Sequence, residues 1–440
     1  MLSPSPPDKR GKEPWFSALG SRDFRYYWIG SIISISGLQM LWMVQGWLIY
    51  ELTGSKLLLG FIGLAGALPS IPLTLLGGMV ADKVDQRRLL IAVELLRVTI
   101  LAVLATLCFI QVVQVWHIFA AAFANSAIGA FAGPARMAMF PHLIQRSALT
   151  NAVALNAAVH PGTRIFGPAV GGIILAQVFD ATSSAMIAAA TLYSLTALGH
   201  SLNATFLYRV HLPPVQRSRK GTVLQGIWAG LEFMGRNRIF AFLTGMAFCS
   251  MVFATASSAL YPVFSKDILH AGPSGLGFLY MAMGIGSFSG AIIGGRLSNP
   301  QRRSPAIIVG MAVQGIFLFL FAVSSWYPGA LLFLALMGIG ASVFDVAAQT
   351  TLQLLVPDEF RGRVMGVYGM RFHIARPIGE LQVGSIAALI SAPFAVALGG
   401  GLVLAIALLV AAPSRLMRQL NMTLAGAEVA EVNHGRQANV

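Results

Sequence analysis

Residues 77–88 read Gly-Gly-Met-Val-Ala-Asp-Lys-Val-Asp-Gln-Arg-Arg, a charged stretch between two long apolar runs. Upstream, residues 57–76 contain no charged side chain, and downstream, residues 89–115 contain only Glu94 and Arg97. A hydrocarbon core of roughly 30 Å needs about twenty apolar residues per helical crossing. The pattern therefore predicts two membrane-spanning helices joined by a tight, charged turn.

The composition extends this interpretation to the whole chain. Of its 440 residues, 56% are hydrophobic and only 10% are charged, and the mean hydropathy is +0.73. Soluble domains usually carry about 25% charged residues. Apolar runs long enough to span a bilayer recur along nearly the whole sequence, so we expect an all-α membrane protein of about twelve helices.

The excess of basic residues has a strongly uneven distribution. The formal net charge is +14, but only Lys56 and Lys266 fall in segments expected on the outer side. The remaining Lys and Arg residues lie on the inner side, apart from four within spans: Arg97, Arg164, Arg371 and Arg376. By the positive-inside rule, both termini are expected in the cytoplasm of a bacterial inner membrane. The basic surface then faces anionic lipids, and nucleic acid is not expected as a partner.

A basic, proline-containing segment divides the apolar spans into two sets. We expect a disordered cytoplasmic tail at residues 1–20, a first six-helix bundle at 21–207, a cytoplasmic linker with an amphipathic helix at 208–238, a second bundle at 239–412, and a cytoplasmic tail at 413–440. Residues 294–303 repeat the glycines and arginines of 77–88, with Ser298 in place of the aspartate. This repetition predicts two related halves.

The spacing Gly-x-x-x-Asp-Lys-x-x-x-Arg-Arg resembles the loop 2–3 signature of the major facilitator superfamily of secondary transporters. The resemblance implies twelve transmembrane helices in two six-helix bundles around a central cavity, and it gives this loop the role of a conformational switch. The residues to which that role carries over, with two neighbouring charges on the next helix, are Gly78, Asp82, Lys83, Arg87, Arg88, Glu94 and Arg97.

Three further segments narrow the resemblance. Residues 47–55, 133–144 and 149–156 are similar to a branch that includes enterobactin exporters and transmembrane secretion effectors. Gly167, Pro168, Gly171 and Gly172 match the second half of the exporters' antiporter motif. The branch implies export of a siderophore, drug or metabolite. Many of its members carry an aspartate after the glycine of helix 1, where this chain has Leu38 and Gln39.

Ionisable residues within the spans are candidates for function, because each costs at least ~2.5 kcal/mol to insert. Glu94 and Arg97 are three residues apart and can pair on one helix face, and His160 and Arg164 are four apart. On the eleventh expected helix, residues 364–390, one face carries His373, Arg376 and Glu380, with Arg371 beside it. Asp345 needs a partner from another helix, for which Arg371 or Arg376 is suitable. Structural pairing and proton or substrate binding both remain open for these residues.

The first helix offers an amphipathic surface. Gln39, Trp42 and Met43 could line a substrate pocket, since Met and Trp give adaptable apolar contacts and Gln can orient a ligand. Ordinary packing between helices explains the same residue types.

No catalytic or metal-binding pattern is found in the sequence. Walker A, HExxH and Gly-x-Ser-x-Gly motifs are absent, and Cys108 and Cys249 stand alone in apolar spans. We therefore expect no enzyme activity and no cofactor. The expected partners are an amphipathic small molecule, protons and membrane lipids, and the chain is expected to be monomeric.

The favoured function is secondary active export by alternating access, with proton antiport. Two alternatives stay open within transport: a lysophospholipid flippase, and a facilitator without proton coupling. A membrane enzyme and a receptor-like binding module are the alternatives outside transport.

Overall fold

The computed structural model describes residues 17–81, 83–145, 148–211, 223–297 and 300–417. These residues form helices and connecting turns, with no strand among them. Eleven helical segments in this part of the chain are long and apolar enough to cross a membrane. Together with one further helix described below, they account for the expected twelve crossings. Most of the two predicted tails lies outside the described residues. Within the described part, Ser17–Gly20 form a short 3₁₀ helix instead of a disordered segment, and residues 415–417 are helical.

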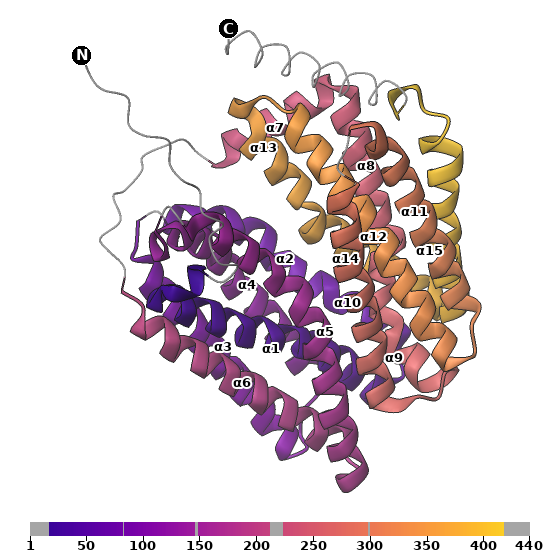
Figure 1. Ribbon diagram of the computed structural model, residues 1–440. Coiled ribbons are helices and arrows are strands. Elements are labelled where there is room, and N and C mark those ends of the chain that lie inside the picture. The colour runs from indigo at the N-terminus through magenta and orange to yellow at the C-terminus, as the bar shows by residue number, and fades with distance from the viewer. Residues whose placement is uncertain (1–16, 82, 146–147, 212–222, 298–299, 418–440) are drawn as a thin grey trace, which may run out of the picture.

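The first six long helices pack against one another and form the N-terminal bundle (Figure 1). In this bundle α6 packs on α1 and α3, α2 packs on α4, and α5 packs on α1. The helices are α1 (Arg22–Thr53), α2 (Lys56–Ala81), α3 (Gln86–Phe109), α4 (Val115–Met139), α5 (Leu149–Thr182) and α6 (Ala185–Arg209). A short 3₁₀ helix, η2 (Phe140–Leu143), follows α4.

The later helices form the C-terminal bundle, in which α12 packs on both α10 and α11, and α15 packs on α11 (Figure 1). Its elements are α8 (Arg238–Phe253), η4 (Thr255–Leu260), α9 (Tyr261–Val263), η5 (Phe264–Ile268), α10 (Gly272–Arg296), α11 (Pro300–Val323), α12 (Tyr327–Leu355), α13 (Asp358–Gly369), α14 (Arg371–Leu389), α15 (Ala392–Ala405) and η6 (Ile406–Ala411).

Two expected helices are interrupted. The first helix expected in the second bundle forms α8, which ends at Phe253 and is followed by the short elements η4, α9 and η5. The helix predicted at 364–390 is divided into α13 and α14, with the break at Met370. Because α14 carries three charged residues, Arg371, Arg376 and Glu380, it is not one of the eleven apolar segments, yet it packs against α2 and α8.

The linker contains the expected helix, α7 (Val223–Arg236), which packs on α13. A Cβ atom on Gly230 would lie 2.8 Å from the carbonyl oxygen of Arg363, and the rings of Phe233 and Phe360 stack with centroids 4.8 Å apart. Met234 is buried, whereas Leu231 is exposed. The helix therefore has one face on the protein and one face away from it, as an interfacial helix requires.

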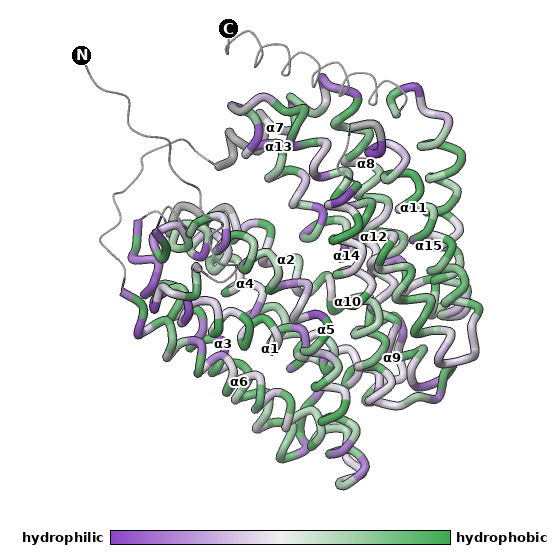
Figure 2. Tube along the Cα trace, viewed as in Figure 1, coloured by the Kyte–Doolittle hydropathy of each residue, from purple (hydrophilic) through white to green (hydrophobic). Residues whose placement is uncertain are grey.

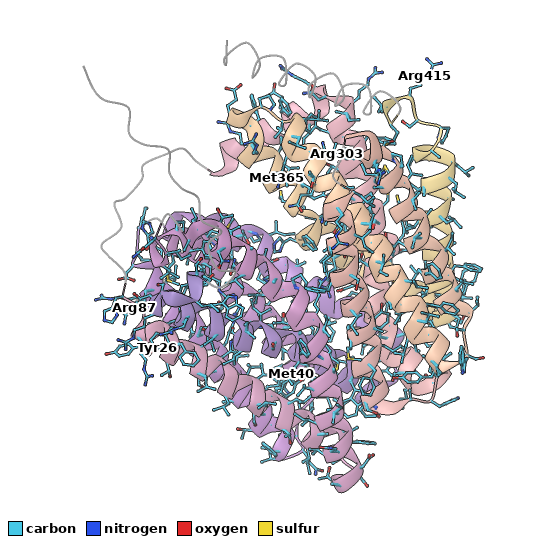
Figure 3. The ribbon with its side chains drawn as sticks, in the orientation of Figure 1. Tyr26, Met40, Arg87, Arg303, Met365 and Arg415 are labelled. Atoms are coloured by element: carbon cyan, nitrogen blue, oxygen red, sulfur yellow. The ribbon has the colours of Figure 1, made fainter. Side chains whose placement is uncertain are left out.

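Apolar residues dominate the long helices, and hydrophilic residues gather mainly near their ends (Figure 2). Tyr26 and Arg87 lie together at one end of the N-terminal bundle, while Arg303 and Arg415 lie at one end of the C-terminal bundle (Figure 3). We call the end of the molecule that carries Arg87, Arg303 and Arg415 the basic end. The two bundles diverge toward it and meet toward the opposite end (Figure 1).

Candidate functional site

The charged turn within residues 77–88 connects α2 to α3. Asp82 lies outside the described residues, and Gly78 is in α2. Lys83 and Arg88 are exposed, and Asp85 caps α3 by accepting a hydrogen bond of 3.0 Å from the Arg88 backbone N–H. Arg87 donates from Nε to the Leu207 carbonyl at 3.0 Å and from a terminal nitrogen to that of Tyr208. This turn is thereby fastened to the end of α6.

A buried polar cluster, which we call the Glu94 cluster, joins four helices of the N-terminal bundle. Glu94 and His200 are fully buried, and His200 Nδ1 lies 2.5 Å from Glu94 Oε2. Arg136 donates to Oε1 at 3.1 Å, and Arg97 Nη1 lies 3.8 Å from the same oxygen. Ser34 Oγ lies 3.4 Å from each carboxylate oxygen. The predicted pairing of Glu94 with Arg97 is confirmed.

The same carboxylate has three further partners that the sequence did not reveal. Ser34, Arg136 and His200 come from α1, α4 and α6, so no helical spacing links them to Glu94 on α3. One feature of the sequence could have indicated such a contact. His200 lies within the apolar residues 185–209 and has no ionisable neighbour on its own helix, so its partner had to come from another helix. Two guanidinium groups surround one carboxylate, and this pairing explains how the buried charges of the Glu94 cluster are tolerated inside the bundle.

The glycine- and proline-containing motif of α5 provides close contacts with neighbouring helices. A Cβ atom on Gly167 would lie 2.9 Å from the Ser36 carbonyl oxygen on α1, and one on Gly171 would contact Met40 and Met43. On Gly172 it would lie 2.7 Å from Gly277 Cα on α10. These residues therefore set the distance of α5 from α1 and from the C-terminal bundle.

A second contact of this kind lies where α2 meets α14. A Cβ atom on Gly384 would lie 2.9 Å from Gly60 Cα, and one on Gly63 would overlap the carboxylate of Glu380. The two bundles are thus in backbone contact along two helix pairs, α5 with α10 and α2 with α14.

The charged residues of the eleventh crossing are paired. Arg371 binds both carboxylate oxygens of Asp345 on α12, at 2.8 and 3.0 Å, and also donates to Tyr368 Oη at 2.6 Å. The prediction that Asp345 finds its partner on another helix is confirmed, with Arg371 as that partner. The Arg371 side chain is 6% exposed and that of Asp345 is 40% exposed, so the carboxylate is the accessible member.

Arg376 connects the two bundles. Its Nε donates to Glu380 at 2.7 Å, one turn along α14, and its guanidinium lies over the Trp42 ring of α1, 5.1 Å from the centroid. Trp42 nevertheless remains 47% exposed. About half of this ring is therefore accessible beside a contact that joins the two bundles.

The other predicted residues of α1 and α5 divide into two groups. Gln39 and Met43 are buried against α5, at Gly167 and Gly171 respectively. His160 and Arg164 are exposed, as is His373 of α14. Arg164 lies where α5 meets the C-terminal bundle, because a Cβ atom on Gly284 of α10 would lie 2.9 Å from the Arg164 carbonyl oxygen. Its charge is close enough to those of Arg376 and Asp345 to be influenced by them.

Contacts at the end opposite the basic end hold the bundles together. The Tyr50 hydroxyl donates to Asp267, and Lys266 Nζ lies 2.7 Å from Glu51 Oε2. Lys266 also lies over the Tyr50 ring, 5.9 Å from its centroid. We call these four residues the closing cluster. None of its contacts was predicted, because the partners are more than 200 residues apart.

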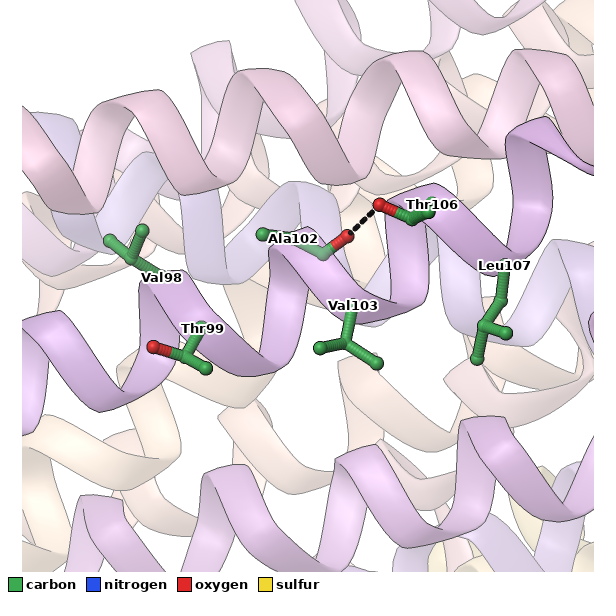
Figure 4. Close-up of a pocket in the computed structure, with 6 residues that line it drawn as sticks. All are labelled: Val98, Thr99, Ala102, Val103, Thr106 and Leu107. Atoms are coloured by element: carbon green, nitrogen blue, oxygen red, sulfur yellow. Dashed lines mark hydrogen bonds between the residues drawn. The ribbon is translucent and has the colours of Figure 1, made fainter.

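A shallow groove follows the outer face of α3, lined by Val98, Thr99, Ala102, Val103, Thr106 and Leu107 (Figure 4). Its hydroxyl groups are satisfied within the helix, as when Thr106 donates to the Ala102 carbonyl at 2.9 Å. An exposed apolar face of this kind suits lipid tails. Within the described residues, no group of three or more His, Cys, Asp or Glu side chains could hold a metal ion.

Comparisons with known proteins agree with this architecture. Residues 14–431 match the transmembrane secretion effector family. The chain is 26% identical to the multidrug efflux pump Tap of Mycolicibacterium fortuitum, over 78% of this chain and 83% of Tap. It is 26% identical to the enterobactin exporter EntS of Shigella boydii, over 84% of this chain and 86% of EntS.

A solved structure shares the fold. A bacterial homologue of the human lysosomal transporter Spinster, in an inward-facing and unoccupied conformation, superimposes with a TM-score of 0.69 at 14% sequence identity, covering 94% of this chain and 99% of that one. The match of the family over nearly the whole length, with the helical architecture, gives one conclusion. The chain belongs to the transmembrane secretion effector family of major facilitator superfamily transporters.

Proposed function

We propose that this protein exports an amphipathic small molecule across the bacterial inner membrane by alternating access, in exchange for protons. The observation that carries the proposal is the pair Trp42 and Arg376. They contact each other from different bundles, and the exposed half of the Trp42 ring leaves room for a ligand beside this contact. An apolar ring beside a guanidinium suits a molecule that is partly apolar and partly polar.

The arrangement of contacts supports a particular state of the transport cycle. The closing cluster joins the bundles at one end, whereas they diverge at the basic end (Figure 1). The positive-inside rule assigns the basic end to the cytoplasm. The structure then corresponds to a state open to the cytoplasm, from which an exported molecule would enter.

Movement between two states needs surfaces that can slide without gaps. The glycine contacts of α5 with α10 and of α2 with α14 provide such surfaces, because backbone meets backbone without interlocking side chains. The two bundles would rock about these contacts, breaking the closing cluster while they come together at the basic end.

Proton coupling requires an acid that can reach water in at least one state. Asp345 is the strongest candidate, because its side chain is 40% exposed while Glu380 is 9% exposed and Glu94 is fully buried. Binding of a proton by Asp345 would break its ion pair with Arg371 and so link protonation to the contact between α12 and α14.

Transport in reconstituted vesicles tests the proposal. Purified protein in sealed vesicles is supplied with erythromycin, enterobactin and a fluorescent lysophospholipid in separate experiments, with a pH gradient, a membrane potential or neither. The proposal expects one of the two non-lipid compounds to move only when a pH gradient is imposed, with proton movement in the opposite direction. Movement of the lysophospholipid alone, without any gradient, would identify a flippase instead. Movement of erythromycin or enterobactin at the same rate without a gradient would identify a facilitator.

A further inference from the structure

We propose that the molecule bound between the bundles carries an acidic group and that Arg164 is the residue that receives it. This inference rests on the proposed function, since it specifies the chemical class of molecule for the same site. The inference is based on an imbalance between positive and negative side chains at the site between the bundles.

The positive charges around this site outnumber the negative ones. Arg371 already occupies both carboxylate oxygens of Asp345, and Arg376 is paired with Glu380. Arg164 makes no hydrogen bond or ion pair with any residue that the structure describes, and its electrostatic neighbours are Arg376 and Asp345. His160, four residues before Arg164 on α5, adds no negative charge. One guanidinium is thus left without a carboxylate.

The position of Arg164 makes this imbalance significant. The residue lies near the middle of α5, a helix of 34 residues, where an unpaired charge is costly. Its backbone is in contact with the C-terminal bundle, because a Cβ atom on Gly284 of α10 would lie 2.9 Å from the Arg164 carbonyl carbon and oxygen. This contact fixes the base of the side chain at the meeting point of the bundles. An anionic group of the bound molecule would complete the pairing, and a guanidinium is well suited to carboxylates, sulfonates and phosphates.

The remaining surroundings favour an aromatic or otherwise apolar body on the same molecule. The exposed part of the Trp42 ring provides an apolar surface, and the guanidinium of Arg376 lies over the same ring. Tyr280 of α10 interacts electrostatically with Arg376 and Glu380, but its hydroxyl already donates to the Ser258 carbonyl at 3.1 Å. The ligand class that fits is therefore an amphiphile with one acidic group. A membrane potential that is negative inside would itself favour outward movement of such an anion.

Two probes with the same aromatic skeleton test the inference. Anilinonaphthalene sulfonate carries one negative charge, and phenylnaphthylamine is its neutral counterpart. Binding of each is measured by equilibrium dialysis against the full chain in lipid nanodiscs, with empty nanodiscs subtracted. We expect the wild type to bind the sulfonate about tenfold or more tightly than the neutral probe, because hydrogen bonds to charged groups contribute this much to affinity.

The variants locate the effect. Arg164→Gln should remove the preference for the sulfonate while leaving binding of the neutral probe unchanged, and Arg164→Lys should retain part of it. Arg302→Gln, at an exposed arginine of α11, is the matched control and should behave as wild type. Equal affinity of the wild type for both probes, or an undiminished preference in Arg164→Gln, would overturn the inference. Because binding needs no gradient, this test is independent of transport. A protein that binds the sulfonate preferentially but transports nothing would contradict the proposed function and would still support the assignment of Arg164.

Discussion

Gly172 of α5 and Gly277 of α10 are in direct backbone contact across the two bundles. A Cβ atom on Gly172 would lie 2.7 Å from Gly277 Cα, and one on Gly277 would lie 2.5 Å from the Pro168 carbonyl oxygen. Side chains do not approach backbone atoms this closely in proteins, so each position accepts only glycine unless the helices separate. The motif of α5 thus places its helix against the opposite bundle.

Replacing Gly172 by alanine should therefore disturb both packing and transport. Overpacking of this kind costs about 1–3 kcal/mol, which exceeds the ~1 kcal/mol that alanine gains over glycine within a helix. We expect a lower melting temperature in detergent and a slower rate of transport in vesicles. Gly162→Ala on the same helix is the control, because its added methyl group would have no atom of another described helix within 4 Å. Identical behaviour of the two variants would contradict this account of the contact.

The Glu94 cluster should contribute strongly to stability. In Glu94→Gln the buried side chains of His200 and Arg97 lose their carboxylate partner, and breaking a buried pair in this way costs about 3–5 kcal/mol. Thermal unfolding of the purified protein should show a large loss. Glu232→Gln, which removes the exposed pair with Arg236, should change stability by less than ~1 kcal/mol. Equal melting temperatures for the two variants would show that the cluster is not stabilising.

The sequence predicted well those features that depend on helical spacing or on apolar length. The spans, the Glu94–Arg97 pair and the pairing of Asp345 belong to this group, because a run of apolar residues or an isolated acid limits the choices. The break between α13 and α14 was missed, since nothing in the apolar pattern interrupts residues 364–390 at Met370.

Contacts between distant helices could not be predicted from one sequence. His200 reaches Glu94 from 106 residues away, and Asp267 reaches Tyr50 from 217 residues away. The spacing of residues along one helix does not determine which other helices pack against it. The same limit applies to Gln39 and Trp42, since only the packing of α5 decides that the first is buried and the second exposed.

The closing cluster should govern the balance between the two states. In Lys266→Glu the ion pair with Glu51 becomes a repulsion, so the end opposite the basic end should open more readily. Labelling of a cysteine placed at Gly46 of α1, where a Cβ atom would lie 3.5 Å from Pro262 of the opposite bundle, should become faster. The double variant Glu51→Lys with Lys266→Glu restores opposite charges and should return the rate toward that of the parent. A rate unaffected by either variant would rule out a closing role for this pair.

Asp345 should be required for coupling to protons. Asp345→Asn cannot exchange a proton, so transport driven by a pH gradient should fall at least tenfold, whereas movement of substrate down its own gradient should persist. The measurement is substrate flux in vesicles with and without the pH gradient. Asp180→Asn, at an exposed position near the end of α5, serves as the control. Full gradient-driven transport by Asp345→Asn would assign the proton to another residue.

Alternating access itself is tested most directly by measuring distances at both ends of the molecule. Spin labels are placed at Thr53 and His270 near the closing cluster, and in a second sample at Gln145 and Glu359 near the basic end; all four positions are exposed. Distances are recorded by pulsed electron resonance at several pH values, with and without a transported compound. The account predicts that one distance lengthens when the other shortens. Two distances that stay fixed, or that change in the same direction, would contradict it.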